Sequence, residues 1–396
     1  MLIQLIIFLF LGILTGTITG LFPGIHINLV GAMLVALSFS IFSSINPLFL
    51  VVFIVSVAIA HTFFDFIPSI FLGASNEDTA LSVLPGHEML KEGFGYQAVY
   101  LTMLGAVFGT IILIFLSFPF VALTPKIYNF IKPLIPFLLI AVSLGLIFSE
   151  EKKFSALFIF LLSGILGLIV LNLDFVKEPL LPMLSGLFGA STLILSIKAK
   201  TQIPKQNTEE KIKTNLFKPL LASAIASPLT IFLPALGSGQ ISIIGNQISR
   251  TDRRGFLLLQ GSVNILTMGF SFLSLYTISK ARTGAAVAVQ NLIGIPEKNS
   301  FILILIVILI SGIISFFLCL KTARIFATIL EKINYTKLSI FTLILVSIVV
   351  LVFSGFFGFF IFIVSTFTGV YGILSKVRRT NLMGCLLLPT IVLYLI

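Results

Sequence analysis

The chain has 396 residues, of which 58% are hydrophobic and only 10% carry a charge. Soluble domains carry about 25% charged residues, so this composition excludes an ordinary soluble protein. The net charge of +11 does not indicate nucleic-acid binding, because the basic residues are dispersed at the ends of apolar runs, as in membrane-protein loops. Continuous apolar runs also exclude a membrane β-barrel, whose strands alternate over about ten residues.

The apolar runs predict an all-α polytopic membrane protein with about ten to twelve membrane segments, some of half length, since a spanning helix needs roughly 20 apolar residues. Helices are expected in the first half at 2–20, 25–42, 47–72, 97–122, 129–148, 154–172 and 181–197. Those expected in the second half cover 216–232, 238–249, 255–279, 300–320, 338–353, 355–374 and 381–395. Polar loops are expected at 73–95 and 280–298.

A proline–glycine break interrupts an apolar run near the start of each half. The first break contains Pro23 and Gly24, and the second runs from Leu233 to Ser242 with Pro234, Gly237 and Gly239. Proline has no amide donor, and lipid cannot satisfy the backbone groups that an interrupted helix leaves exposed. Two breaks at corresponding positions therefore predict a transporter binding site where they meet.

The chain is predicted to be duplicated. The first membrane repeat covers 1–197, a cytoplasmic polar linker 198–214 and the second repeat 215–396. Weak internal matches keep their order along the chain, and they pair Pro23 with Pro234, Asp78-Thr79-Ala80 with Arg282-Thr283-Gly284, Ser163–Gly167 with Ser354–Gly358, and Gly186 with Gly384. An odd number of crossings per half would give inverted repeats with re-entrant helices.

The breaks also supply anion-binding chemistry, because a helix N-terminus carries free amides and roughly half a positive charge. Candidate substrate-binding residues are Pro23, Gly24, Asn28, Pro234, Gly237, Ser238, Gly239, Gln240, Arg282 and Thr283. The polar side chains have a structural alternative as helix caps or interhelical contacts. For Arg282, a structural ion pair with Asp78 that joins the two halves is an alternative of equal weight to a place in the substrate site.

The candidate coupling-ion residues are Asp65, Asn76 and Asp78. A carboxylate inside a membrane segment costs about 2.5–3.5 kcal/mol, so Asp65 should face a cavity or a partner. The alternative is a solvated carboxylate at a helix end. The histidines lack zinc-site spacing, and no nucleophile–base pair is evident. We therefore expect no metal site, no cofactor beyond Na⁺ or H⁺ as the coupling ion, and no enzymatic activity.

Three motifs in order resemble the TctA-like family, the large membrane subunit of tripartite tricarboxylate transporters, in its shorter archaeal form. They are Gly20-Leu21-Phe22-Pro23-Gly24, the segment 80–98 and Leu181–Gly189. The resemblance implies a carrier of inverted repeats that is driven by an ion gradient and moves carboxylates. It also implies a small membrane subunit and an extracytoplasmic binding protein as partners.

The leading hypothesis is a secondary transporter (permease) for an organic anion in the cell membrane, working by alternating access around the two breaks. A flippase for polyprenyl phosphate or another lipid phosphate would use the same anion-binding helix ends. A membrane-embedded enzyme or scaffold is the third hypothesis. The sequence leaves open the substrate, the ion and homodimerisation.

Overall fold

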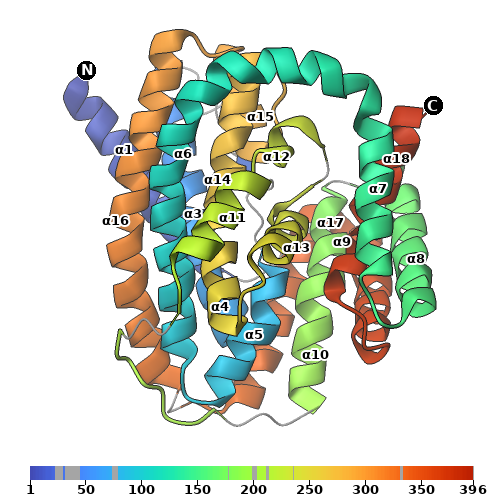
Figure 1. Cartoon of the computed structure of the whole chain (residues 1–396). Helices are drawn as coiled ribbons and strands as arrows, with labels where there is room; N and C mark the ends of the chain where they lie inside the picture. The colour runs from blue at the N-terminus through green and yellow to red at the C-terminus, as the bar shows by residue number, and fades with distance from the viewer. Residues whose placement is uncertain are drawn as a thin grey trace.

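The computed structural model describes residues 1–22, 30–31, 45–73, 79–176, 178–198, 203–210, 214–234, 236–330 and 333–395. Within these ranges the regular elements are all helical (Figure 1). Eight of the helical segments are long and apolar enough to cross a membrane, and three shorter apolar helices accompany them. The predicted class, an all-α polytopic membrane protein, is confirmed.

The helices follow the predicted order in both halves. The first half contains α1 (Leu2–Leu21), α3 (Pro47–Phe64), α4 (Phe66–Phe71), α5 (Ala80–Lys91), α6 (Gly95–Ile131), the 3₁₀ turn η1 (Lys132–Leu134), α7 (Ile135–Phe148), α8 (Lys153–Leu171), α9 (Leu180–Leu184), the π-helical turn η2 (Ser185–Ala190) and α10 (Ser191–Lys198). The second contains α11 (Phe217–Ala226), α12 (Leu229–Phe232), α13 (Ser238–Ser249), α14 (Arg253–Ile278), α15 (Gly284–Ile293), α16 (Lys298–Leu330), α17 (Tyr335–Leu374), η3 (Arg379–Met383) and α18 (Gly384–Leu395).

The structure differs from the prediction in three kinds of place, and the helix expected at 25–42 lies almost wholly outside the described residues. The helices expected at 47–72 and 216–232 are each divided, into α3 and α4 and into α11 and α12. Helices expected to be separate are joined: α6 continues through Pro119 and Pro125, and α17 through a kink at Gly355, whose φ is 69°. Prolines are tolerated inside membrane helices because neighbouring helices satisfy the freed backbone groups. The expected polar loops 73–95 and 280–298 instead contain the short helices α5 and α15.

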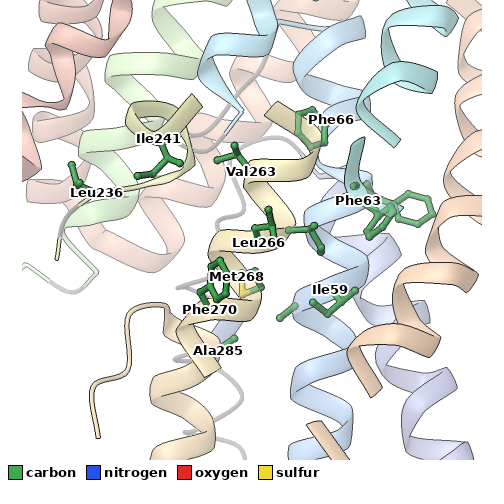
Figure 2. Packing of buried hydrophobic residues seen from close by; sticks show 14 of the residues in the cluster. Ile59, Phe63, Phe66, Leu236, Ile241, Val263, Leu266, Met268, Phe270 and Ala285 are labelled. Atoms are coloured by element: carbon green, nitrogen blue, oxygen red, sulfur yellow. The ribbon is translucent and has the colours of Figure 1, made fainter. Parts of the chain in front are cut away.

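The two halves are interleaved. Helix α3 of the first half packs against α16 of the second, and α14 of the second packs against α6 of the first. Figure 1 shows α6 rising along one side, crossing the end of the molecule and leading to α7 on the other side. Figure 2 shows the apolar layer between α3 and α14, including Phe63 and Leu266.

The contact between α6 and α14 depends on glycines on both helices. A side chain at Gly105 would overlap the carbonyl oxygen of Leu258, and one at Gly261 would overlap the carbonyl oxygen of Thr102. Helix backbones in membranes pack this closely only where small residues face each other. These two glycines therefore set the distance between the halves.

Replacing Gly105 with alanine should destabilise the protein by about 1–3 kcal/mol, the usual range for overpacking, because the new methyl group would force α6 away from α14. Gly145→Ala is the matched control, since a Cβ at this helical glycine meets no atom within 4 Å. Thermal unfolding in detergent measures both. A Gly105→Ala protein as stable as the control would contradict the close contact.

Candidate substrate and ion sites

The structure confirms the helix end that precedes the first break, because α1 stops at Leu21, and Phe22 is extended. The break itself lies outside the described residues. This applies to five predicted site residues: Pro23, Gly24, Asn28, Asn76 and Asp78. Their assignments to substrate or ion remain predictions.

The second break is present where the sequence placed it. Helix α12 ends at Phe232, the half-buried Pro234 lies in the turn, and α13 begins at Ser238 after an extended Gly237. The first residues of α13, Ser238, Gly239 and Gln240, are buried. An interruption at this depth exposes helix-end amides to the protein interior rather than to lipid.

Gln240 lies at the start of α13 and caps it from within. Its Oε1 accepts a hydrogen bond from the backbone amide of Gly237 at 3.0 Å. The side chain is fully buried, and within the described part of the chain its Nε2 has no hydrogen-bond partner. A buried amide donor without a partner is uncommon in proteins. Here it stands beside a helix N-terminus, so both groups favour a ligand with acceptor oxygens.

Arg282 contacts the end of α12, the helix that precedes the second break. Its Nη2 donates to the carbonyl oxygens of Ile231 at 3.0 Å and Phe232 at 3.2 Å, the last residues of α12. The guanidinium thus satisfies acceptors that the interrupted helix leaves open. The alternative partner considered from the sequence, Asp78, is outside the described residues.

The segment 279–284 follows α14 and includes the first residue of α15. Arg282 contacts the second break. Gly284 packs against Gly31, which is helical and follows the first break in the sequence. A Cβ at Gly31 would lie 2.7 Å from the Gly284 carbonyl. Thr283 caps α15 and donates to Ser271 Oγ at 3.0 Å. Residues from both halves therefore meet here, and the substrate-binding roles of Arg282 and Thr283 remain predictions.

Asp65, the described member of the predicted ion site, lies at the one-residue junction between α3 and α4. It is buried, with 7% of its surface exposed, so the solvated alternative is wrong. Thr79 Oγ1 lies 3.5 Å from Asp65 Oδ2 and 2.6 Å from Ser69 Oγ. This cluster of a carboxylate and two hydroxyls offers the oxygen ligands that hard cations prefer. Among the described residues, no three His, Cys, Asp or Glu side chains form a metal-binding group.

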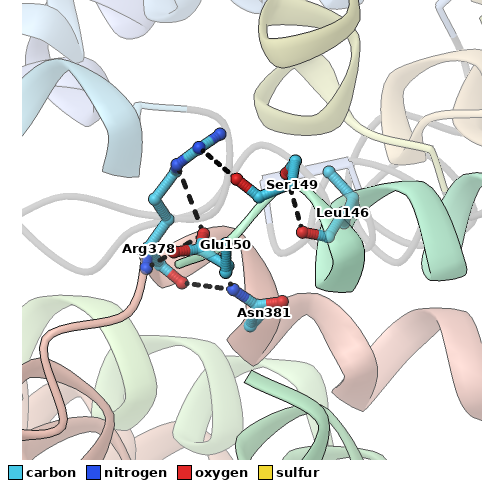
Figure 3. A network of polar contacts seen from close by, with 5 residues as sticks. All are labelled: Leu146, Ser149, Glu150, Arg378 and Asn381. Atoms are coloured by element: carbon cyan, nitrogen blue, oxygen red, sulfur yellow. Dashed lines mark hydrogen bonds and ion pairs between the residues drawn. The ribbon is translucent and has the colours of Figure 1, made fainter. Parts of the chain in front are cut away.

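Sequence reasoning missed two polar contacts around η3. Glu150, expected in an ordinary loop, lies in the turn between α7 and α8 but is only 8% exposed. Its Oε1 lies 3.2 Å from Arg378 Nε and accepts from Asn381 Nδ2 at 3.2 Å (Figure 3). The next residue, Arg379, contacts Thr192 instead. No local motif marks either contact, because the partners are far apart in the sequence.

Among the described residues, eight helical segments are long and apolar enough to span a membrane, and the buried interruption before α13 is a feature of many membrane transport proteins. The chain belongs to the tripartite tricarboxylate transporter TctA family, whose model matches residues 6–384. It is 32% identical to the uncharacterized protein MJ1079 of Methanocaldococcus jannaschii over 98% of this chain and 99% of that protein. No solved structure matches the chain. It is therefore a multi-pass membrane protein of a transporter family.

Replacing Arg282 with methionine should destabilise the fold by about 1.5–3 kcal/mol, because the carbonyls of Ile231 and Phe232 would lose a charged donor. Lys280→Met is the control, since this side chain is exposed in the same segment. Thermal unfolding in detergent compares the two variants. Equal unfolding temperatures would show that the contact of Arg282 with α12 is dispensable.

Proposed function

We propose that this protein is an ion-coupled secondary transporter for an organic anion of the carboxylate type. Membership of the TctA family supports transport of this class. The observation that carries the proposal is that the segment 279–284 contacts both the second break, through Arg282, and Gly31, which follows the first break in the sequence. Helix N-termini and the Gln240 amide offer donors to carboxylate oxygens there. At this site the anion is bound mainly by helix N-termini and by the side-chain amide of Gln240.

Inverted repeats are part of this proposal, and a recurring packing pattern supports them. Gly384 of α18 packs against Phe160 and Ser163 of α8. Gly186 of η2 packs against Phe362 and Ser365 of α17, and the two residues of each pair are equally far apart in the sequence. The pairing of Gly186 with Gly384 fits the sequence match. The packing favours Ser365, rather than Ser354, as the counterpart of Ser163.

Helix pairs recur in the same way. The contact of α3 with α16 corresponds to that of α14 with α6, and the contact of α1 with α3 to that of α11 with α14. Each half thus supplies one helix to the other at equivalent places. Such an arrangement suits alternating access, in which one bundle rocks against the other around a fixed site.

The coupling ion of the proposal is Na⁺ or H⁺ at Asp65, with Thr79 and Ser69 as neighbouring oxygen groups. Binding of a cation there would offset the buried carboxylate. By family membership, a small membrane subunit and an extracytoplasmic binding protein would complete the transport system.

Purified protein in proteoliposomes should take up labelled di- or tricarboxylates, and Gln240→Leu should reduce uptake about tenfold by removing a buried donor to the anion. Gln247→Leu, on the exposed face of the same helix, should leave uptake unchanged. Uptake of no small anion, with or without an ion gradient, would overturn the proposed function. Transfer of a phosphorylated lipid between leaflets instead would assign the protein to the flippases.

Asp65→Asn should remove the dependence of uptake on the Na⁺ or proton gradient, because the neutral amide cannot exchange its charge with a bound cation. Asp174→Asn, at an exposed loop position, is the matched control. Initial uptake rates with and without each gradient measure the effect. If Asp65→Asn keeps the wild-type gradient dependence, the coupling site lies elsewhere.

A further inference from the structure

Two adjacent arginines at the start of η3 have different surroundings. Arg378 is held by Glu150: its backbone amide and Nε both approach Glu150 Oε1, at 3.3 and 3.2 Å, and its Nη2 donates to the carbonyl oxygen of Ser149 at 2.8 Å. Asn381 donates to the same carboxylate (Figure 3). These bonds fix η3 against the turn between α7 and α8, and so fix the backbone from which Arg379 extends.

Arg379 is partly buried and points to a different partner. Its Nη1 donates to the hydroxyl oxygen of Thr192, in α10, at 2.8 Å. Within the described ranges it has no ion pair, whereas Arg253, Arg324 and Arg378 each contact a glutamate. A guanidinium carries five N–H donors, so most donors of Arg379 are unused. A partly buried guanidinium with spare donors is suited to bind an anionic ligand.

Thr192 lies beside Gly73 and His87, and neither of these residues carries a negative charge. A Cβ at Gly73 would lie 3.0 Å from Thr192 Cγ2 and 3.2 Å from His87 Cε1, so these three residues meet. Nδ1 of His87 lies 2.9 Å from the Ile70 carbonyl oxygen, and Nε2 lies 2.9 Å from the Tyr335 hydroxyl. Both ring nitrogens of His87 thus have partners, so His87 donates or accepts no hydrogen bond at Arg379.

A short stretch of chain connects the residues around Thr192 with Asp65, the proposed ion-binding residue. Gly73, with a φ of 71°, follows Leu72 at the end of α4, and α4 starts directly after Asp65. Gly73 therefore connects the surroundings of Arg379 with the carboxylate that we assign to the coupling ion. Arg282, in contrast, already donates to the backbone of α12.

We infer that Arg379 and Thr192 form a second anion subsite, which binds one carboxylate or phosphate group through the guanidinium. The planar fork of arginine suits both groups, because two parallel N–H bonds can reach two oxygens. The inference rests on the proposed function, since the substrate class proposed there carries the carboxylate groups that this subsite would bind.

Calorimetric titration of the purified full-length protein with citrate, succinate and inorganic phosphate tests the subsite. Arg379→Gln should weaken the affinity about tenfold or more, and Thr192→Val by a smaller factor, while Arg379→Lys should retain part of the affinity. Arg250→Gln, an exposed arginine outside the site, should bind like wild type. Thermal unfolding identifies any variant that fails to fold, and Arg379→Lys and Thr192→Val then decide the case.

The outcomes separate this inference from the proposed function. Wild-type affinity in folded Arg379→Gln and Thr192→Val proteins would overturn the subsite but leave carboxylate transport standing. Phosphate binding that depends on Arg379, with no carboxylate uptake, would support the subsite and contradict the proposed function. Phosphatidate in nanodiscs that competes with phosphate at Arg379 would show that a lipid headgroup is a second source of the same ligand chemistry. No binding of any of these anions by the wild type would overturn both.

Discussion

The constraint on which this structure depends is that an interrupted membrane helix must have its backbone groups satisfied inside the protein. At the second break, Arg282 donates to the last carbonyls of α12 and Gln240 accepts from the amide that precedes α13. The segment after α14 is tied back by Ser271, which accepts from Arg282 and Thr283. The same polar groups that stabilise the break surround the place where we propose that the anion binds.

Close packing of helix backbones makes room for these breaks without opening the fold to lipid. The glycines of α6 and α14 bring the two halves into contact, and Gly167 of α8 and Gly369 of α17 repeat such a contact with α18 and η2. Such interfaces of small residues suit the rocking of one helix bundle against the other that we propose.

Much of this organisation could be predicted from the sequence, because hydropathy and proline–glycine signals act locally. The ends of α1 and α12, the start of α13 and the burial of Asp65 followed from such signals. The helices α5 and α15 were missed because they are shorter than a membrane span. The contacts of Glu150 with Arg378 and of Arg379 with Thr192 join distant parts of the chain, so that only tertiary packing reveals them.

The central claim is that the halves are inverted copies that meet at one polar centre. Arg324, near the end of α16, contacts Tyr96 at the start of α6, so these two helices, which we propose to be equivalent, run in opposite directions. Single cysteines at the exposed Lys91 and Lys298, before α6 and at the start of α16, test this in a background with Cys319 and Cys385 replaced by serine. A membrane-impermeant maleimide should label one site only from outside and the other only from inside. Labelling of both from the same side would contradict the inverted arrangement.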